Sequence, residues 1–147
     1  MHPSDGVIHI LVCFLFMQEL DKVVFCHQHF LPYIDDLINR LEISVLGCNI
    51  NGIYLGCLLY TDDIILLSQS VTPMQIMLEI CGQFANEMDI TFNADKSVAM
   101  RIGSRYKVLC SLLQLSGRDL IYVNKIKYLG VYITASSKLC AIMIIVN

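Results

Sequence analysis

The apolar stretches of this chain are all short. The longest run from Ile10 to Met17, from Ile64 to Leu67 and from Leu139 to Val146. Each is well below the ~20 apolar residues that a helix needs to cross a bilayer. Hydrophobic residues nevertheless make up 56% of the sequence and charged residues only 16%, which excludes a disordered low-complexity chain. We therefore expect strands that are buried on both faces, or surfaces that a partner must cover.

Cysteine usage and the first residues indicate where such a chain would reside. The seven cysteines are an odd number, contain no Cys-x-x-Cys pair and mostly lie in apolar runs, as buried free thiols do. The residues from His2 to Asp5 carry no lysine or arginine, unlike the start of a secretory signal. We therefore expect an intracellular, reducing location, in the nucleus or the cytoplasm, and no membrane.

Charge divides the chain into an acidic and a basic part. Residues 1–95 carry two bases against twelve acids, whereas the residues from Lys96 onward carry eight bases and a single acid, Asp119. Such asymmetry is typical of chains that bring one side to a polyanion, where lysine and arginine contact nucleic-acid phosphates. On charge alone, a solvated rim of strands is the simpler explanation.

Local patterns predict a first helix and a tight hairpin. Apolar residues at helical spacing predict a helix from Pro32, with Asp35 and Asp36 in its first turn and Gly47 as its stop. Asn51-Gly52, placed between two short apolar segments, is the strongest local signal for a hairpin.

A second helix and several short strands follow. Thr72-Pro73-Met74-Gln75 fits a capping box with proline at the first helical position. The apolar stripe expected on this helix consists of Ile76, Met77, Ile80, Phe84 and Met88. Short strands are expected at residues 90–93, 97–102, 108–115, 120–123 and 128–134. The elements together predict an α+β fold, a mostly antiparallel sheet with helices packed on one face.

Two adjacent carboxylates stand between two predicted strands. Cys57 to Tyr60 and Ile64 to Leu67 have strand length, and Thr61-Asp62-Asp63 joins them as an acidic tip. Adjacent carboxylates repel each other unless a cation neutralises them. Magnesium takes one or two carboxylates, several waters and phosphate oxygens, so the pair is a candidate metal site for phosphoryl transfer. The alternative is a plain acidic turn.

The same Y-x-D-D spelling occurs a second time, at Tyr33-Ile34-Asp35-Asp36. There the period is helical, so the two acids belong to a helix and not to the tip of a hairpin. Only Tyr60-Thr61-Asp62-Asp63 is therefore a candidate catalytic element.

Four segments together resemble reverse transcriptases of non-long-terminal-repeat (LINE-type) retrotransposons. Gly56 to Ser68 resembles their catalytic box, in which Y-A-D-D is followed by an apolar strand and serine. Phe92 to Ser97 is similar to their N-x-x-K-[ST] element, and Tyr128-Leu129-Gly130-Val131 to their Y-L-G box. Tyr33 to Leu41 resembles the helix that precedes the catalytic hairpin. The matches keep the family's order over residues 33–134.

The resemblance implies a polymerase palm. Asp62 and Asp63 would be its metal-binding catalytic carboxylates, with Mg2+ as the cofactor, and Lys96 would face the phosphates of the incoming nucleotide. The residues implied for substrate and primer binding are Tyr60, Tyr128, Leu129 and Gly130. The partners implied are an RNA template, a DNA primer and a deoxynucleoside triphosphate. From the residues alone, Lys96 could equally be an exposed turn lysine, and Tyr128 and Leu129 a core strand with a bulge at Gly130.

The chain departs from the family pattern on its N-terminal side. Thr61 replaces the usual alanine, which a strand tolerates. The family's Gln-Gly loop before the first helix has no counterpart between Asp21 and Pro32 except the Leu-Pro edge. A palm also needs a third aspartate from an earlier strand, and no such strand is evident around the earlier acids. These acids are Asp5, Glu19 and Asp21.

We therefore divide the chain into three parts. Residues 1–29 are predicted to be a divergent or unrelated apolar segment, residues 30–134 a partial palm that is incomplete on its N-terminal side, and residues 135–147 an apolar tail. Three functions stay open. In the first, the chain is a reverse transcriptase fragment that is inactive, or nearly so, on its own. In the second, it is a non-catalytic remnant that binds nucleic acid or a protein partner. In the third, it is a degenerate chain without a selected activity.

Overall fold

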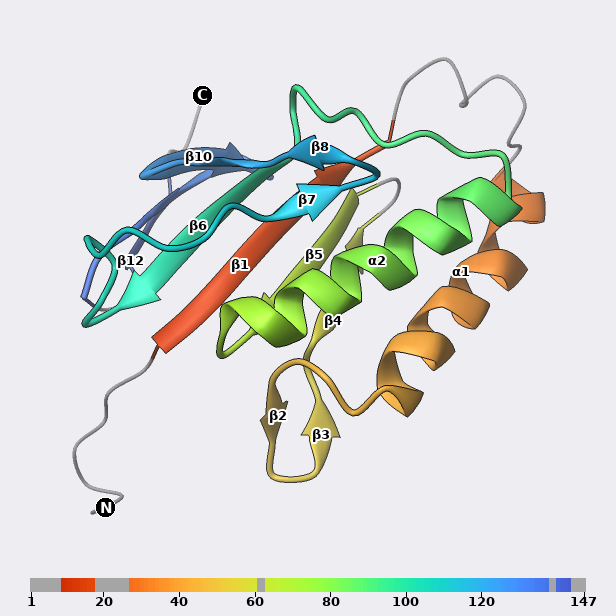
Figure 1. The fold of residues 1–147 in the computed structure, drawn as a ribbon, viewed down its shortest axis with the longest axis horizontal. Coiled ribbons are helices and arrows are strands. Elements are labelled where there is room, and N and C mark those ends of the chain that lie inside the picture. Colours follow the sequence, from red (N-terminus) through yellow and green to blue (C-terminus); the bar gives the residue numbers. More distant parts are fainter. Residues whose placement is uncertain (1–8, 18–26, 61–62, 138–139, 144–147) are drawn as a thin grey trace.

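A computed structural model describes residues 9–17, 27–60, 63–137 and 140–143. Its centre is a five-stranded sheet with the strand order β4-β5-β1-β6-β9 (Figure 1). Neighbouring strands are antiparallel, except that β9 is parallel to β6. The strands are β1 (His9–Phe16), β4 (Cys57–Tyr60), β5 (Asp63–Ser68), β6 (Val98–Gly103) and β9 (Ile121–Tyr122).

The middle strand, β1, is buried on both faces. Leu11, Cys13 and Leu15 point to one face, and Val12 and Phe14 to the other, as the two-residue period of a strand requires. None of these five side chains is more than 5% exposed. A strand buried on both faces has no polar alternation, and this is why the sequence pattern did not predict β1. The strand explains part of the high apolar content and lies in the same sheet as β4 and β5.

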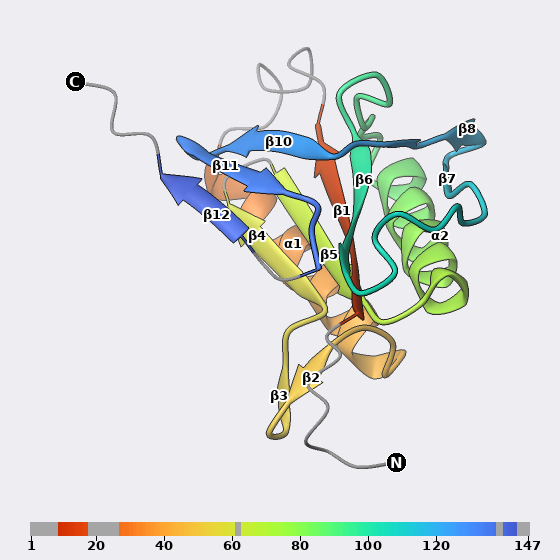
Figure 2. The same cartoon turned by 90° about the vertical axis from the view of Figure 1, so that its left-hand side faces the viewer.

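Two helices cover one face of the sheet, which confirms the predicted fold class (Figures 1 and 2). They are α1 (His27–Ile43) and α2 (Val71–Glu87). Their apolar side chains, Leu37 of α1 and Met77 and Phe84 of α2 among them, share one core with the inward residues of β1 and β5. The sheet and helices together are therefore a two-layer arrangement.

The predicted bounds of α1 were wrong at both ends. The helix begins at His27 and not at Pro32, and it ends at Ile43 before reaching Gly47. Asp35 and Asp36 therefore lie in the helix interior and not in its first turn. Asp36 instead forms an ion pair with Arg40 one turn later, at 2.8 Å.

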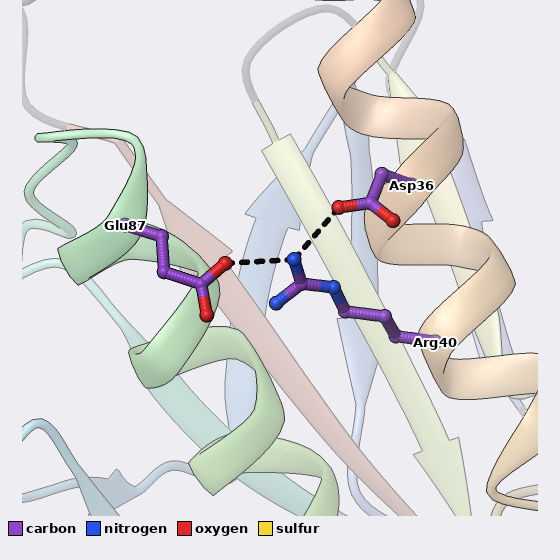
Figure 3. A network of polar contacts seen from close by, with 3 residues as sticks. All are labelled: Asp36, Arg40 and Glu87. Carbon is purple, nitrogen blue, oxygen red and sulfur yellow. Dashed lines mark hydrogen bonds and ion pairs between the residues drawn. The ribbon is translucent and has the colours of Figure 1, made fainter.

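Arg40 links the two helices. Its Nη2 atom lies 2.8 Å from Asp36 of the same helix and 2.7 Å from Glu87 at the end of α2 (Figure 3). Its guanidinium also stands 5.9 Å from the centre of the Phe84 ring. One cation therefore bridges two carboxylates where the helices pack together.

The predicted start and stripe of α2 were partly wrong. The N-cap is Ser70, two residues before the expected Thr72, so Pro73 lies inside the first turn, where its missing N–H costs little. Ile76 was expected in the core but is 40% exposed. Met77 and Phe84 are buried as predicted. The other buried residues of the helix are Met74, Leu78, Cys81, Gly82 and Ala85.

A second, three-stranded sheet lies on the other face of the main sheet (Figure 2). It consists of β10 (Lys125–Tyr128), β11 (Val131–Thr134) and β12 (Cys140–Met143). The single strand predicted at residues 128–134 is therefore two strands with a turn between them. Leu129 and Gly130 form that turn with φ of 51° and 77°, the positive values of a two-residue hairpin turn. Tyr128 packs with Phe14 and Met100 in a second core.

Two small hairpins complete the described fold. β2 (Asn49–Ile50) and β3 (Ile53–Tyr54) pair across Asn51-Gly52, which confirms that prediction. β7 (Gln114–Leu115) and β8 (Arg118–Asp119) form the other hairpin, so the strand expected at 108–115 shortens to two residues. Residues 90–93 contribute only a bridge between Phe92 and Met17. Within the described residues, no helix has the length and apolarity to span a bilayer.

Candidate active site

The predicted acidic hairpin is present. β4 and β5 pair antiparallel, with Tyr60 opposite Asp63 at the end of the pairing. Asp63 is the first residue of β5 and is half-buried, whereas Tyr60 is exposed. Thr61 and Asp62 lie outside the described residues, so Asp63 is the member of the carboxylate pair whose place is defined.

The strand beside Asp63 carries no carboxylate at the adjacent position. In the register of β1 and β5, Phe16 stands opposite Asp63. The described residues contain no group of three histidine, cysteine, aspartate or glutamate side chains that could hold a metal ion. The earlier acids Asp5, Glu19 and Asp21 fall outside the described residues. The described residues of the site therefore do not by themselves supply three ligands for a divalent metal ion.

The turn that carries Lys96 is attached to the same end of the sheet. The N–H of Asn93 donates to the carbonyl of Phe16 at 2.6 Å, and the N–H of Phe16 donates to Oγ of Ser97 at 3.2 Å. Phe16 is the residue opposite Asp63, so the structure brings Asp63 and the Lys96 turn to one place. Lys96 itself is exposed.

Asn93 and Ser97 shape this turn. The side-chain oxygen of Asn93 accepts the N–H groups of Asp95 at 3.1 Å and of Lys96 at 3.2 Å, as asparagine does in turns. The hydroxyl of Ser97 donates to the carbonyl of Asn93 at 2.7 Å. These contacts explain why Asn and Ser occur at this spacing, whereas Lys96 contributes only its backbone N–H to them. No role of Ser97 was predicted from the sequence, although the N-x-x-K-[ST] pattern includes it.

We expect Ser97→Ala to lower the free energy of unfolding by about 1–3 kcal/mol, because it leaves the buried N–H of Phe16 without an acceptor. Chemical denaturation measures this loss. Ser104→Ala is the matched control, since Ser104 is exposed, and it should change stability by less than about 0.5 kcal/mol. Equal stability of the two variants would contradict the attachment of the turn to β1.

The Y-L-G residues divide between the core and the surface. Tyr128 is 9% exposed, and its ring centre lies 5.6 Å from that of Phe14 and 6.4 Å from that of Phe16. Leu129 and Gly130 are exposed at the tip of the hairpin. A bulky residue such as leucine rarely adopts positive φ, so the turn presents Leu129 to solvent at some cost in strain. The exposed part of the Y-L-G element is therefore the tip of this hairpin.

The pKa of Tyr128, in the β10–β11 hairpin, is raised by its surroundings, which include charges of the β4–β5 hairpin. Burial raises the pKa of its phenol, and the charges of Asp63 and Tyr60 raise it further. Its hydroxyl is buried without a hydrogen-bond partner. Tyr128 packs on Phe16, which stands opposite Asp63, and Asp63 pairs with Tyr60, so the β10–β11 and β4–β5 hairpins lie near the same end of β1.

The basic residues of the C-terminal part do not form one patch around Asp63. Lys125 and Lys127 of β10 both lie over the ring of Tyr132, at 4.3 Å and 5.9 Å from its centre. Arg101, on β6, donates to the carbonyl of Val108 in the loop that follows. Each of these cations therefore lies against a neighbour in the C-terminal part of the chain.

Comparison with known protein families identifies the chain. The family described as "Reverse transcriptase (RNA-dependent DNA polymerase)" matches residues 11–133. A search of curated proteins found no match. The fold, with a five-stranded sheet and two helices, is compatible with a partial polymerase palm. The match covers most of the sequence and begins within β1, so the chain belongs to the reverse transcriptase family.

Proposed function

We propose that the chain is a fragment of the reverse transcriptase of a LINE-type retrotransposon, with the β4–β5 hairpin as its catalytic hairpin. Asp62 and Asp63 are then the carboxylates for Mg2+, and Lys96 faces the nucleotide phosphates. The observation that carries the proposal is the attachment of the Lys96 turn to Phe16, opposite Asp63. Two motifs far apart in the sequence thereby meet at one end of the sheet.

The isolated chain is proposed to be inactive. RNA-directed DNA synthesis with two metal ions needs carboxylates that hold both ions. Phe16 occupies the position of β1 next to Asp63, and no three-ligand group is found among the described residues. The missing ligand and the fingers would come from the remainder of a polymerase.

Primer extension tests the inactivity. On an adenylate RNA template with a thymidylate DNA primer and either Mg2+ or Mn2+, we expect extension no greater than that of the protein-free control. Asp63→Asn should give the same background. Extension that disappears in Asp63→Asn would overturn the inactivity and would assign catalysis to Asp63 in this chain alone.

A chimera tests whether the hairpin is competent. Residues 56–134 replace the matching segment of an active reverse transcriptase of the same family. We expect the chimera to extend the primer and to lose extension with Asp63→Asn. A folded but inactive chimera would contradict the assignment of the β4–β5 hairpin as catalytic.

A second candidate function is non-catalytic binding of nucleic acid through the Lys125–Lys127 face. Both lysines are exposed and share the ring of Tyr132. This function predicts salt-dependent binding of an RNA–DNA hybrid that weakens in Lys125→Gln and Lys127→Gln but not in Asp63→Asn. Binding that Asp63→Asn weakens more than the lysine variants would contradict it.

A further inference from the structure

A cavity lies on the β9 side of the main sheet, away from Asp63. Its volume is about 440 Å³, and it is an open cavity bounded by β6, β9, the loop that connects β6 to β7, and Asn124 and Ala135. Arg101 of its wall stands opposite Leu11 in β1, and Leu11 stands opposite Ser68 at the far end of β5 from Asp63. At ~3.3 Å per residue, the five positions from Ser68 to Asp63 correspond to about 17 Å along the strand. The cavity is therefore separate from the candidate active site.

The loop that borders the cavity is held by its own backbone. Tyr106 N–H donates to the carbonyl of Gly103 at 3.1 Å, and Val108 N–H donates to that of Arg105 at 3.1 Å. On the opposite wall, the hydroxyl of Tyr122 accepts a hydrogen bond from the thiol of Cys110 at 2.9 Å and donates to the carbonyl of Ser111 at 3.0 Å. These bonds indicate a preformed cavity, as is usual for binding sites of this size.

The lining combines aromatic rings with positive charge. Its charged side chains are Arg101 and Lys107, both cations. The Nζ atom of Lys107 lies over the Tyr106 ring, 5.5 Å from its centre, so a cation and an aromatic ring are adjacent in the lining. The sequence from Lys96 to Arg118 contains no acid and has further cations, so positive charge continues beyond the cavity.

The rim of the cavity is unusually apolar for a loop. Leu109 is 97% exposed, Leu112 60% and Val108 58%. Loops normally show polar residues to solvent, and clustered exposed apolar side chains mark contact surfaces. The occupant must therefore be both anionic and partly apolar, and it must offer a flat group to Tyr106.

We propose that this cavity, the Tyr106–Tyr122 pocket, binds one nucleotide unit of a single-stranded nucleic acid. The base stacks on Tyr106 beside the apolar rim, and the phosphates lie at Lys107 and in the field of Arg101. Single-strand sites in general combine a basic path for the backbone with aromatic platforms for the bases. Charge complementarity favours a strand over an isolated nucleotide, because the cations extend beyond one phosphate. The contact needs neither Asp63 nor a metal, so it goes beyond the proposed polymerase function.

Binding of a fluorescein-labelled oligouridylate to the full chain tests this proposal. We expect Tyr106→Leu, which keeps an apolar side chain but removes the ring, to weaken binding by roughly 10-fold. Lys107→Gln should reduce the slope of log K against log salt by about 1. Arg118→Gln removes one exposed cation outside the cavity and is the matched charge control, and it should weaken binding of the strand less than Lys107→Gln does.

Crosslinking locates the bound strand independently of affinity. A thiouridine-containing oligonucleotide should crosslink to the peptide that contains residues 102–118. Crosslinks confined to residues 125–134 or to the β4–β5 hairpin would overturn the proposal. So would equal affinity for free uridine monophosphate, or tighter binding of a peptide of alternating glutamate and leucine. A cooperative thermal transition for each variant excludes unfolding as the cause of weaker binding.

Discussion

The protein is expected to lose stability steeply as the pH rises above 9. Cys13 and Cys81 are fully buried and Cys57 is half-buried, and burial raises the pKa of all three thiols from an ordinary value of 9.0, to about 12 for Cys57. Cys57 and Cys13 raise the pKa of Cys81 further, Cys110 raises that of Cys13, and Glu42 raises that of Cys57. In the folded protein they therefore stay protonated at a pH where unfolded thiols ionise.

The sign and size of this effect follow from proton linkage. Above pH 9 the unfolded chain binds fewer protons than the folded chain, so the free energy of unfolding falls with pH. Each buried thiol lowers the free energy of unfolding by up to about 1.4 kcal/mol per pH unit. Three thiols together lower it by about 4 kcal/mol per pH unit. Below pH 9 the thiols are protonated in both the folded and the unfolded chain, so they cause no loss of stability there. For Cys57 the fall ends near its folded pKa, at about 12.

Denaturant unfolding from about pH 8 to about pH 11, under a reductant, measures the slope. Cys57→Ala is the control variant, and it should lower the slope by about 1.4 kcal/mol per pH unit while lowering stability at neutral pH only through lost packing. A stability that stays flat to pH 11 would contradict the burial of these thiols.

Phe14→Ala is expected to cost about 3–5 kcal/mol of unfolding free energy, a large part of what a small domain has. Phe14 is 2% exposed in the middle strand, and it packs on Tyr128 at a ring-centre distance of 5.6 Å. The substitution removes the closer of the two aromatic contacts between the main sheet and the β10–β11 hairpin and leaves a cavity in the second core.

Two controls accompany this substitution. Phe14→Leu keeps much of the volume and should cost clearly less, and Leu109→Ala, at a 97% exposed position, should cost less than about 0.5 kcal/mol. Chemical denaturation gives all three values. A loss below about 1 kcal/mol for Phe14→Ala would mean that β1 does not occupy the centre of the sheet.

Elements with local determinants were predictable from the sequence. The Asn51-Gly52 hairpin follows from the φ values that these two residues tolerate, 52° and 81°. The β4–β5 hairpin follows from two apolar runs around an acidic tip. The helices were found by their period, but α1 began earlier than expected because Pro32 was read as a start signal and not as a residue within the helix.

Features that depend on distant partners were not predictable. The central place of β1 depends on pairing with β5 and β6, and its uniform apolar character carries no period. For the site, the sequence pointed to Asp63 and Lys96. The hydrogen bond between Phe16 and Ser97 that links them could not be predicted from motif spacing, because it joins residues 81 positions apart in the sequence. The Tyr106–Tyr122 pocket likewise exists only once β6, β9 and their loop are assembled.

The position of β1 also determines when the fold can form during synthesis. β1 leaves the ribosome before both of its neighbours, β5 and β6, which are made much later. Until β5 is complete, a strand-length apolar segment with unpaired backbone groups is exposed, and such segments pair readily with copies of themselves. Sheets whose central strand waits for distant partners form slowly. Co-translational folding of this chain therefore depends on protecting its first strand until the acidic hairpin has emerged.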